Sequence, residues 1–113
     1  MKVVYLDYNG KPAPIDLEEF EIYKVVVIKN RYYVWKSGLY SVKHVDMAEK
    51  FTNGDLSKVR AAGSFSVRPD NKLNATEFHS TSIAYRKINA HMTDEGFSEL
   101  ASMLGLTVED FGW

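Results

Sequence analysis

One histidine stands where a helix is expected to begin. In the stretch SVKHVDMAEKF, apolar residues recur at three-residue spacing, which predicts a helix from about Ser41 to Phe51 with Ser41 as its N-cap. His44 then falls in the first turn, where the positive end of the helix dipole disfavours the imidazolium form. A neutral imidazole can act as a general base or as a nucleophile towards phosphorus. His44 is also compatible with an ordinary exposed helix position, and the sequence leaves both interpretations open.

A second stretch, Ser82-Ile83-Ala84-Tyr85, is suited to holding an anion through its main chain. The small side chains of Ser82 and Ala84 let an anion approach backbone N–H groups where a strand ends or bulges. No Ser-His-Asp order, phosphate-binding loop or dinucleotide fingerprint occurs elsewhere. Because the chain has no cysteine and only three scattered histidines, we expect neither a metal site nor a cofactor.

Hydrophobic periodicity and turn residues predict the elements that must position these groups. Alternation in IYKVVVIK places Tyr23, Val25 and Val27 on one face of a strand and Lys24 on the other, otherwise apolar, face. The expected strands are Val3–Tyr8, Ile22–Lys29, Tyr32–Lys36, Ser64–Arg68, about Thr76–Tyr85 and Leu106–Trp113, with a hairpin turn at Asn30–Arg31. Besides the helix at Ser41, a second helix is expected from Thr93 to Leu104, ended by Gly105, and Asp55 is expected to cap a further helical turn through Ala62.

Strands that pair as hairpins beside two helices predict the α+β class. We therefore expect one domain over residues 1–113, with a mixed, mainly antiparallel sheet of about five to six strands. The length of 113 residues is typical of a single domain. No segment has the roughly 18 apolar residues of a membrane helix, and the start lacks the features of a signal peptide. These absences predict a cytoplasmic protein that does not contact the membrane.

The middle of the chain is basic although the net charge is −1. Residues 22–45 carry five basic side chains and no acidic one, and aromatic residues lie between them. Binders of single-stranded nucleic acid combine basic and aromatic side chains in this way. Tyrosine and tryptophan are, however, also favoured in strands and in protein cores. A catalytically silent module that recognises a partner protein or nucleic acid through this basic aromatic hairpin is thus the alternative to phosphate chemistry. The aromatic residues are Tyr23, Tyr32, Tyr33, Trp35 and Tyr40.

The order of these stretches resembles the Janus family of phosphohistidine phosphatases, which are small single-domain proteins with a mixed sheet and two helices. Ile15-Asp16 and the strand from Tyr23 to Lys29 look like the family's first core strand, and Lys24 matches a lysine that contacts phosphate. His44-Val45-Asp46 looks like the family's His-x-Asp, whose histidine is catalytic. Ser82-Ile83-Ala84-Tyr85 looks like its Ser-x-Ala-Tyr, where the main chain at Ser82 and Ala84 would hold the phosphate.

The resemblance implies metal-independent phosphoryl hydrolysis or phosphate-group binding, with a phosphorylated protein or a small phosphoryl compound as the substrate. His91 lies near a histidine that follows Ser-x-Ala-Tyr in the family. The family's glycine run ending in arginine is here Ala62-Gly63-Ser64-Phe65-Ser66, so Arg60 or Arg68 would have to supply that charge. Arg86 stands where the family has glycine, and it would either crowd the phosphate pocket or add a charge to it.

Overall fold

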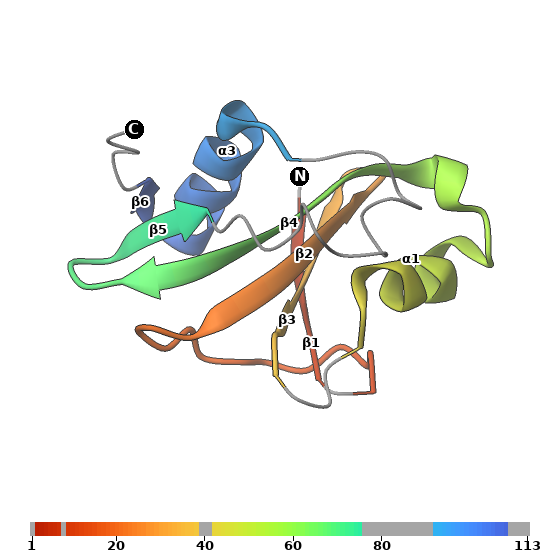
Figure 1. The fold of residues 1–113 in the computed structure, drawn as a ribbon, viewed down its shortest axis with the longest axis horizontal. Helices are drawn as coiled ribbons and strands as arrows, with labels where there is room; N and C mark the ends of the chain where they lie inside the picture. The colour runs from red at the N-terminus through yellow and green to blue at the C-terminus, as the bar shows by residue number, and fades with distance from the viewer. Residues whose placement is uncertain (1, 8, 39–41, 76–91, 109–113) are drawn as a thin grey trace.

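A six-stranded sheet forms the centre of the computed structural model, which describes residues 2–7, 9–38, 42–75 and 92–108 (Figure 1). The strand order is β1-β3-β2-β4-β5-β6. The two outermost pairs, β1 with β3 and β5 with β6, are parallel, and the three pairs between them are antiparallel. The prediction of a single α+β domain with a mixed, mainly antiparallel sheet is therefore confirmed. The strands are β1 Lys2–Leu6, β2 Ile22–Ile28, β3 Arg31–Lys36, β4 Val59–Arg68, β5 Lys72–Ala75 and β6 Thr107–Val108.

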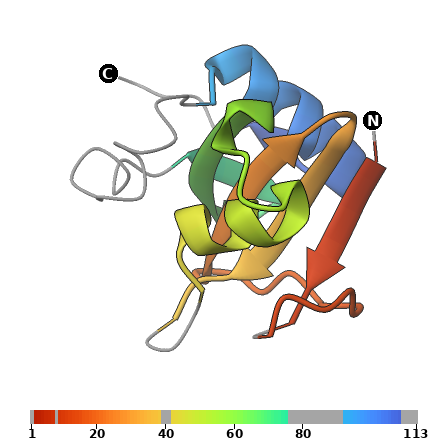
Figure 2. The same ribbon diagram turned by 90° about the vertical axis from the view of Figure 1, so that its right-hand side faces the viewer.

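Two α-helices cover opposite faces of the sheet. Helix α1 spans His44–Thr52 and α3 spans Asp94–Leu104; in Figure 2, α1 lies in front of the strands and α3 behind them. The ends of α3 follow the sequence closely. Thr93 Oγ1 accepts the Gly96 N–H at 3.1 Å, and Gly105 ends the helix at a φ of +75°. Within the described residues, neither helix is long and apolar enough to span a membrane.

Strand β2 is central and apolar on both faces, as its alternation predicts. Tyr23, Val25 and Val27 belong to the core beneath α3, together with Phe97 and Leu100. Val26 and Ile28 belong to the core beneath α1, together with Met47 and Ala48. The predicted split between the two faces is confirmed. Lys24 is the polar exception on the α1 face.

The β2–β3 hairpin turns one residue earlier than predicted. Ile28 pairs with Arg31, so Lys29 and Asn30 form the turn and Arg31 already belongs to β3. Lys29 adopts a φ of +54°, a left-handed conformation that is unfavourable for a residue with a side chain. The strand pairing thus overrides the conformational preference of Lys29.

The helical turn predicted from Asp55 through Ala62 is shorter than expected. Asp55 does cap a helical turn, because its carboxylate accepts the Ser57 N–H at 3.1 Å, but this 3₁₀ turn, η1, spans only Leu56–Lys58. The chain then enters β4 at Val59, which pairs with Ile28. Long-range pairing with β2 outweighs the local helical pattern here, so the strand predicted at Ser64 begins five residues earlier.

The start of α1 also differs from the prediction. Its N-cap is Lys43, whose side chain makes no capping bond, and Ser41 lies outside the described residues. The strand predicted over Thr76–Tyr85 lies outside them as well. The described strand after the Asp70–Asn71 turn is β5, which pairs with β4 and, on its other side, with the first part of the predicted C-terminal strand.

Candidate functional site

His44 is the first residue of α1 and is buried, with 4% of its surface exposed. Its Nε2 lies 2.8 Å from the carbonyl oxygen of Gly63 and 3.4 Å from Ser64 Oγ, both on β4. The Trp35 ring packs edge-on against the imidazole at a centroid distance of 5.7 Å. The interpretation of His44 as an ordinary exposed helix residue is thus wrong, because α1 lays this residue directly on the sheet.

The bond to Gly63 decides where the ring carries its proton. A carbonyl oxygen can only accept, so Nε2 must donate. In a neutral imidazole the lone pair is then on Nδ1. The ring is fixed in orientation and tautomer by main chain, which is how a general base or nucleophile is held ready in many sites.

Lys24 approaches the same end of α1 from the neighbouring strand. Its Nζ donates to the carbonyl oxygen of Val42 at 3.2 Å, and Trp35 Nε1 donates to that oxygen at 2.9 Å. Lys24 is the register partner of both Trp35 on β3 and Ser64 on β4, so these side chains share one face. The structure therefore brings Lys24 and His44, 20 residues apart in sequence, to the start of one helix.

The surroundings of Lys24 disfavour its charge. Burial of the side chain, and secondly the nearby charge of Lys43, lower the pKa of Lys24 below the ordinary lysine value. An anion bound beside these two ammonium groups would favour the charged form of Lys24 and so offset the lowering of its pKa. We call Lys24, Trp35, His44 and Ser64, with the carbonyl groups of Val42 and Gly63, the His44 cluster.

Arg60 and Arg68, the described candidates for the missing arginine charge, lie away from this cluster. Arg60 is exposed at the start of β4 and donates to the carbonyl oxygen of Lys29 at 3.3 Å, near the far end of the β2–β3 hairpin. Arg68 lies at the other end of β4, with its guanidinium 5.6 Å from the centre of the Phe20 ring. Each is four residues from Ser64, about 13 Å along a strand. Ser82, Ala84, Arg86 and His91 lie outside the described residues.

The sequence did not predict that Ser64 and Gly63 contact His44. It also did not predict that the Val42 carbonyl oxygen accepts hydrogen bonds from both Lys24 and Trp35. These groups join His44 and Lys24 only through contacts between distant segments. One signal did point to Ser64, because the segment Ala62–Ser66 was matched to a glycine-arginine motif in the resembled family. Where the family's motif carries an arginine, this segment of β4 therefore places the uncharged side chain of Ser64 beside His44.

The aromatic hairpin offers no stacking platform among the described residues. Its ring-bearing side chains on β2 and β3 are between 1% and 6% exposed and belong to the two cores. Nucleic acid bases cannot stack on rings that the protein itself covers. Tyr40 lies outside the described residues. The buried aromatic residues are Tyr23, Tyr32, Tyr33 and Trp35.

Comparison with protein-family models, curated proteins and solved structures gave no match. Over the described ranges, no group of three or more histidine, aspartate or glutamate side chains is arranged to hold a metal ion.

Proposed function

We propose that the protein binds phosphoryl groups at the His44 cluster and hydrolyses them without metal, as the resemblance to phosphohistidine phosphatases implies. The observation that supports this most directly is the hydrogen bond from His44 Nε2 to the Gly63 carbonyl oxygen. It assigns the lone pair of a neutral ring to Nδ1, in a residue whose helix start also attracts anions. Lys24, on the same face of the sheet, supplies positive charge.

In this proposal, Nδ1 of His44 attacks the phosphorus atom as the bond to the leaving oxygen or nitrogen breaks. The leaving group takes a proton from solvent, and water then hydrolyses the phosphohistidine to inorganic phosphate and the free imidazole. Lys24 leaves the Val42 carbonyl and neutralises the phosphoryl oxygens. The main-chain N–H groups of Ser82 and Ala84 are the further proposed ligands. Phosphorylated proteins and small phosphoryl compounds are the proposed substrates.

The burial of His44 makes access to Nδ1 the decisive question. An NMR titration with inorganic phosphate should shift the ring signals of His44. With chelator present, the protein should hydrolyse phosphoramidate or a phosphohistidine peptide and acquire an acid-labile phosphoryl group on His44. Lys24→Met should slow this turnover about a hundredfold, as loss of an electrostatic stabiliser typically does.

His44→Gln is the sharpest variant, because its amide N–H can still donate to Gly63 while the nucleophile is lost. It should fold and show no turnover. Asp46→Asn, an exposed change two residues away, is the matched control and should keep full activity. Wild-type protein that neither turns over these substrates nor shows a phosphate-dependent shift at His44 would refute the proposal.

A further inference from the structure

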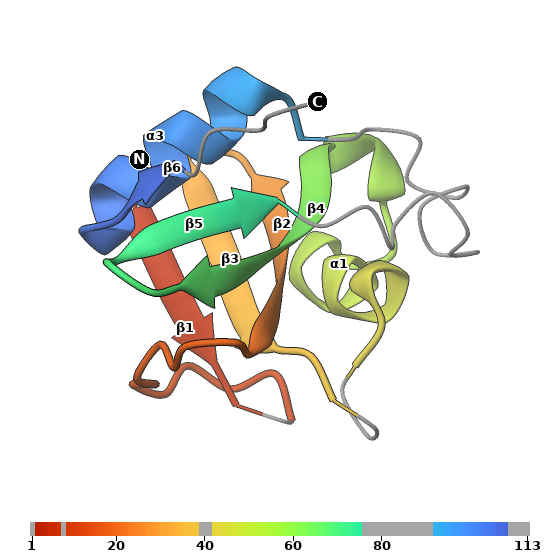
Figure 3. The ribbon, with the colours of Figure 1, turned by 60° about the vertical axis from the view of Figure 1, so that its left-hand side comes forward.

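A cavity of about 310 Å³ opens at the end of the sheet where β1 and β3 finish and β2 begins. The loop between β1 and β2 runs along this end of the sheet (Figure 3). Leu6, Ile15 and the Tyr23 ring supply apolar walls. The cavity is at the lower end of the range for ligand pockets. It is large enough to admit one long side chain.

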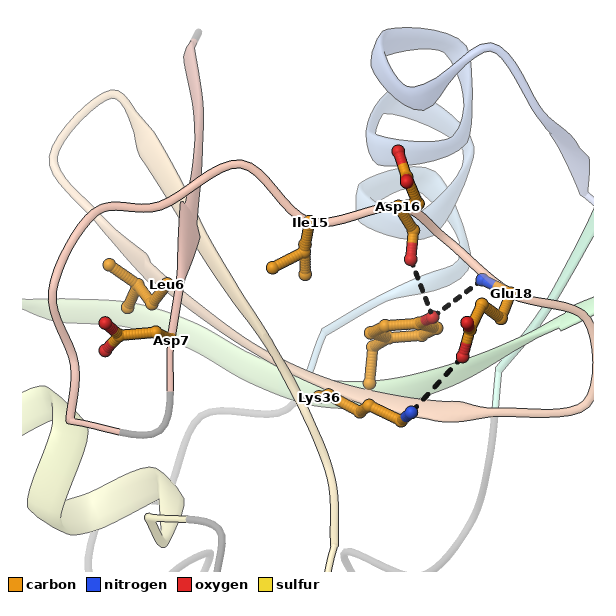
Figure 4. Close-up of a pocket in the computed structure, with 7 residues that line it drawn as sticks. Leu6, Asp7, Ile15, Asp16, Glu18 and Lys36 are labelled. Atoms are coloured by element: carbon orange, nitrogen blue, oxygen red, sulfur yellow. Dashed lines mark hydrogen bonds and ion pairs between the residues drawn. The ribbon is translucent and has the colours of Figure 1, made fainter.

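The loop wall of this cavity is held in place by Tyr23. The Tyr23 hydroxyl accepts the Glu18 N–H at 2.7 Å and donates to the Asp16 carbonyl oxygen at 3.4 Å (Figure 4). Tyr23 itself is 1% exposed, so its hydroxyl is a fixed anchor. Burial raises the pKa of Tyr23, which keeps the phenol protonated. The cavity is therefore a built feature, with walls on both core and loop.

The rim of the cavity is acidic. Asp7, Asp16 and Glu18 contribute three carboxylates, and Lys36 contributes the single positive charge. In Figure 4, Asp7 and Asp16 lie on either side of Ile15. Lys36 Nζ forms an ion pair with Glu18 Oε2 at 3.2 Å. Apolar walls beneath an acidic rim suit a long aliphatic stem that ends in a cation, which is the form of an arginine or lysine side chain.

An exposed aromatic residue extends this surface along the same loop. Phe20 lies two residues beyond Glu18 and is 64% exposed, the more exposed of the two large hydrophobic side chains at the described surface. The Phe20 N–H donates to the Val67 carbonyl oxygen at 2.7 Å, which fixes the residue to β4. The Arg68 guanidinium lies 5.6 Å from the centre of this ring and leaves it mostly exposed. An exposed aromatic ring on a fixed main chain is a common anchor of protein interfaces. A small cation in the cavity would not need it.

We propose that the cavity and Phe20 form a docking surface for a basic segment of a partner protein. One arginine or lysine side chain of that segment enters the cavity, lays its stem against Ile15 and the Tyr23 ring, and places its charge at the rim beside Asp16 and Glu18. Neighbouring residues of the segment pack on Phe20. This surface does not depend on the proposed phosphoryl chemistry, because it uses none of the side chains of the His44 cluster.

The test is an NMR titration with a seven-residue peptide of alternating alanine and arginine at low ionic strength. Amide signals of the cavity walls and of residues 15–21 should shift, and binding should weaken as salt is added. The same peptide with citrulline, a neutral isostere of arginine, should cause no shift. Equal binding of the citrulline peptide, or shifts confined to another surface, would overturn the proposal.

Variants separate the two parts of the surface. Asp16→Asn combined with Glu18→Gln keeps both main-chain bonds to Tyr23 and should weaken peptide binding about tenfold. Phe20→Ala should weaken it about threefold. The matched controls are Asp70→Asn for the charges and Met103→Ala for the exposed apolar residue, and both should bind like the wild type. If arginine amide alone binds as tightly as the peptide and Phe20→Ala has no effect, the site takes a small cation and the docking proposal fails.

Discussion

His44 belongs to the core as much as to the proposed site. Its ring fills space between α1 and β4, bonds to Gly63 and contacts Trp35. Replacement by alanine leaves a cavity and a carbonyl group without its partner. A residue in this position has a structural role whatever its chemistry.

We therefore expect His44→Ala to lower the free energy of unfolding by about 2–4 kcal/mol, measured by urea denaturation. His44→Gln, which can still donate to Gly63, should lose less. Asp46→Ala on the exposed side of α1 should stay within about 0.5 kcal/mol of the wild type. A His44→Ala protein as stable as the wild type would show that the ring does not pack as described.

Lys24 should make stability depend on pH in a defined direction. Because its pKa is lowered by burial and by Lys43, the folded state holds this proton less tightly than the unfolded state. Stability should consequently rise as pH climbs towards the ordinary lysine value of about 10.4. Below the folded-state pKa the contribution is constant.

The measurement is the difference in unfolding free energy between the wild type and Lys24→Met, which should grow in favour of the wild type as the pH approaches the ordinary lysine pKa from below. Three tyrosines with pKa values raised by burial act in the opposite direction, but they are present in both proteins and cancel. A difference that stays flat or shrinks with pH contradicts the description of Lys24. The tyrosines are Tyr5, Tyr23 and Tyr32.

At the scale of elements, Gly63 sets how closely α3 can pack on β4. A Cβ added there would lie 2.8 Å from Phe97 Cζ and 3.3 Å from Met92 Cβ. Gly63→Ala should therefore destabilise the protein by about 1–3 kcal/mol through overpacking. In thermal denaturation, Phe97→Leu should cost less in the Gly63→Ala background than in the wild type. Equal costs would mean that the two residues do not touch.

The β2–β3 hairpin carries a conformational cost at Lys29 that glycine would remove. With φ at +54°, this turn position favours a residue without a Cβ. Lys29→Gly should raise the unfolding free energy by about 0.5–1 kcal/mol. Asn30→Gly, at the other turn residue and not among the positive-φ positions, is the control and should give no such gain. Destabilisation by Lys29→Gly would point to a different turn geometry.

Across the whole molecule, two cores share one sheet. β2 and β3 contribute alternate residues to the core beneath α1 and to the core beneath α3. Neither core can lose its strands without opening the other, so the described parts should unfold together.

In a Trp113→Phe variant, Trp35 is the remaining tryptophan and reports on the α1 side through its fluorescence. Methyl signals of Leu100 report on the α3 side. The two should follow the same urea transition, with the same midpoint. Separate midpoints would mean that one helix detaches while the sheet persists.

Local patterns predicted the elements whose partners lie close in sequence. Residues close together in the sequence are enough to predict the β2–β3 hairpin and the split of β2 into two faces. The same holds for the caps of α3. The error at Val59 and the burial of His44 have a common cause. Both depend on β4 pairing with a strand more than 30 residues earlier, and no local signal encodes that pairing.

In the candidate site, too, the sequence predicted local positions but not the contacts between distant segments. Alternation placed Lys24 on the face of β2 opposite Tyr23, and the helix pattern placed His44 in the first turn of a helix. Their meeting at the Val42 carbonyl, and the contact of His44 with Ser64, depend on how α1 lies on the sheet. The sequence suggested the meeting only through the order of the resembled motifs.

The edge of β1 bears on whether copies of the chain aggregate. The Ala13 N–H donates to the Tyr5 carbonyl oxygen, and Leu6 forms an isolated antiparallel bridge with Pro12, so residues 11–13 already occupy part of the outer edge. Pro12 and Pro14 have no N–H with which to continue a ladder outwards. A second molecule that approaches this edge therefore meets a short, proline-flanked segment, and such edges oppose the growth of intermolecular sheets.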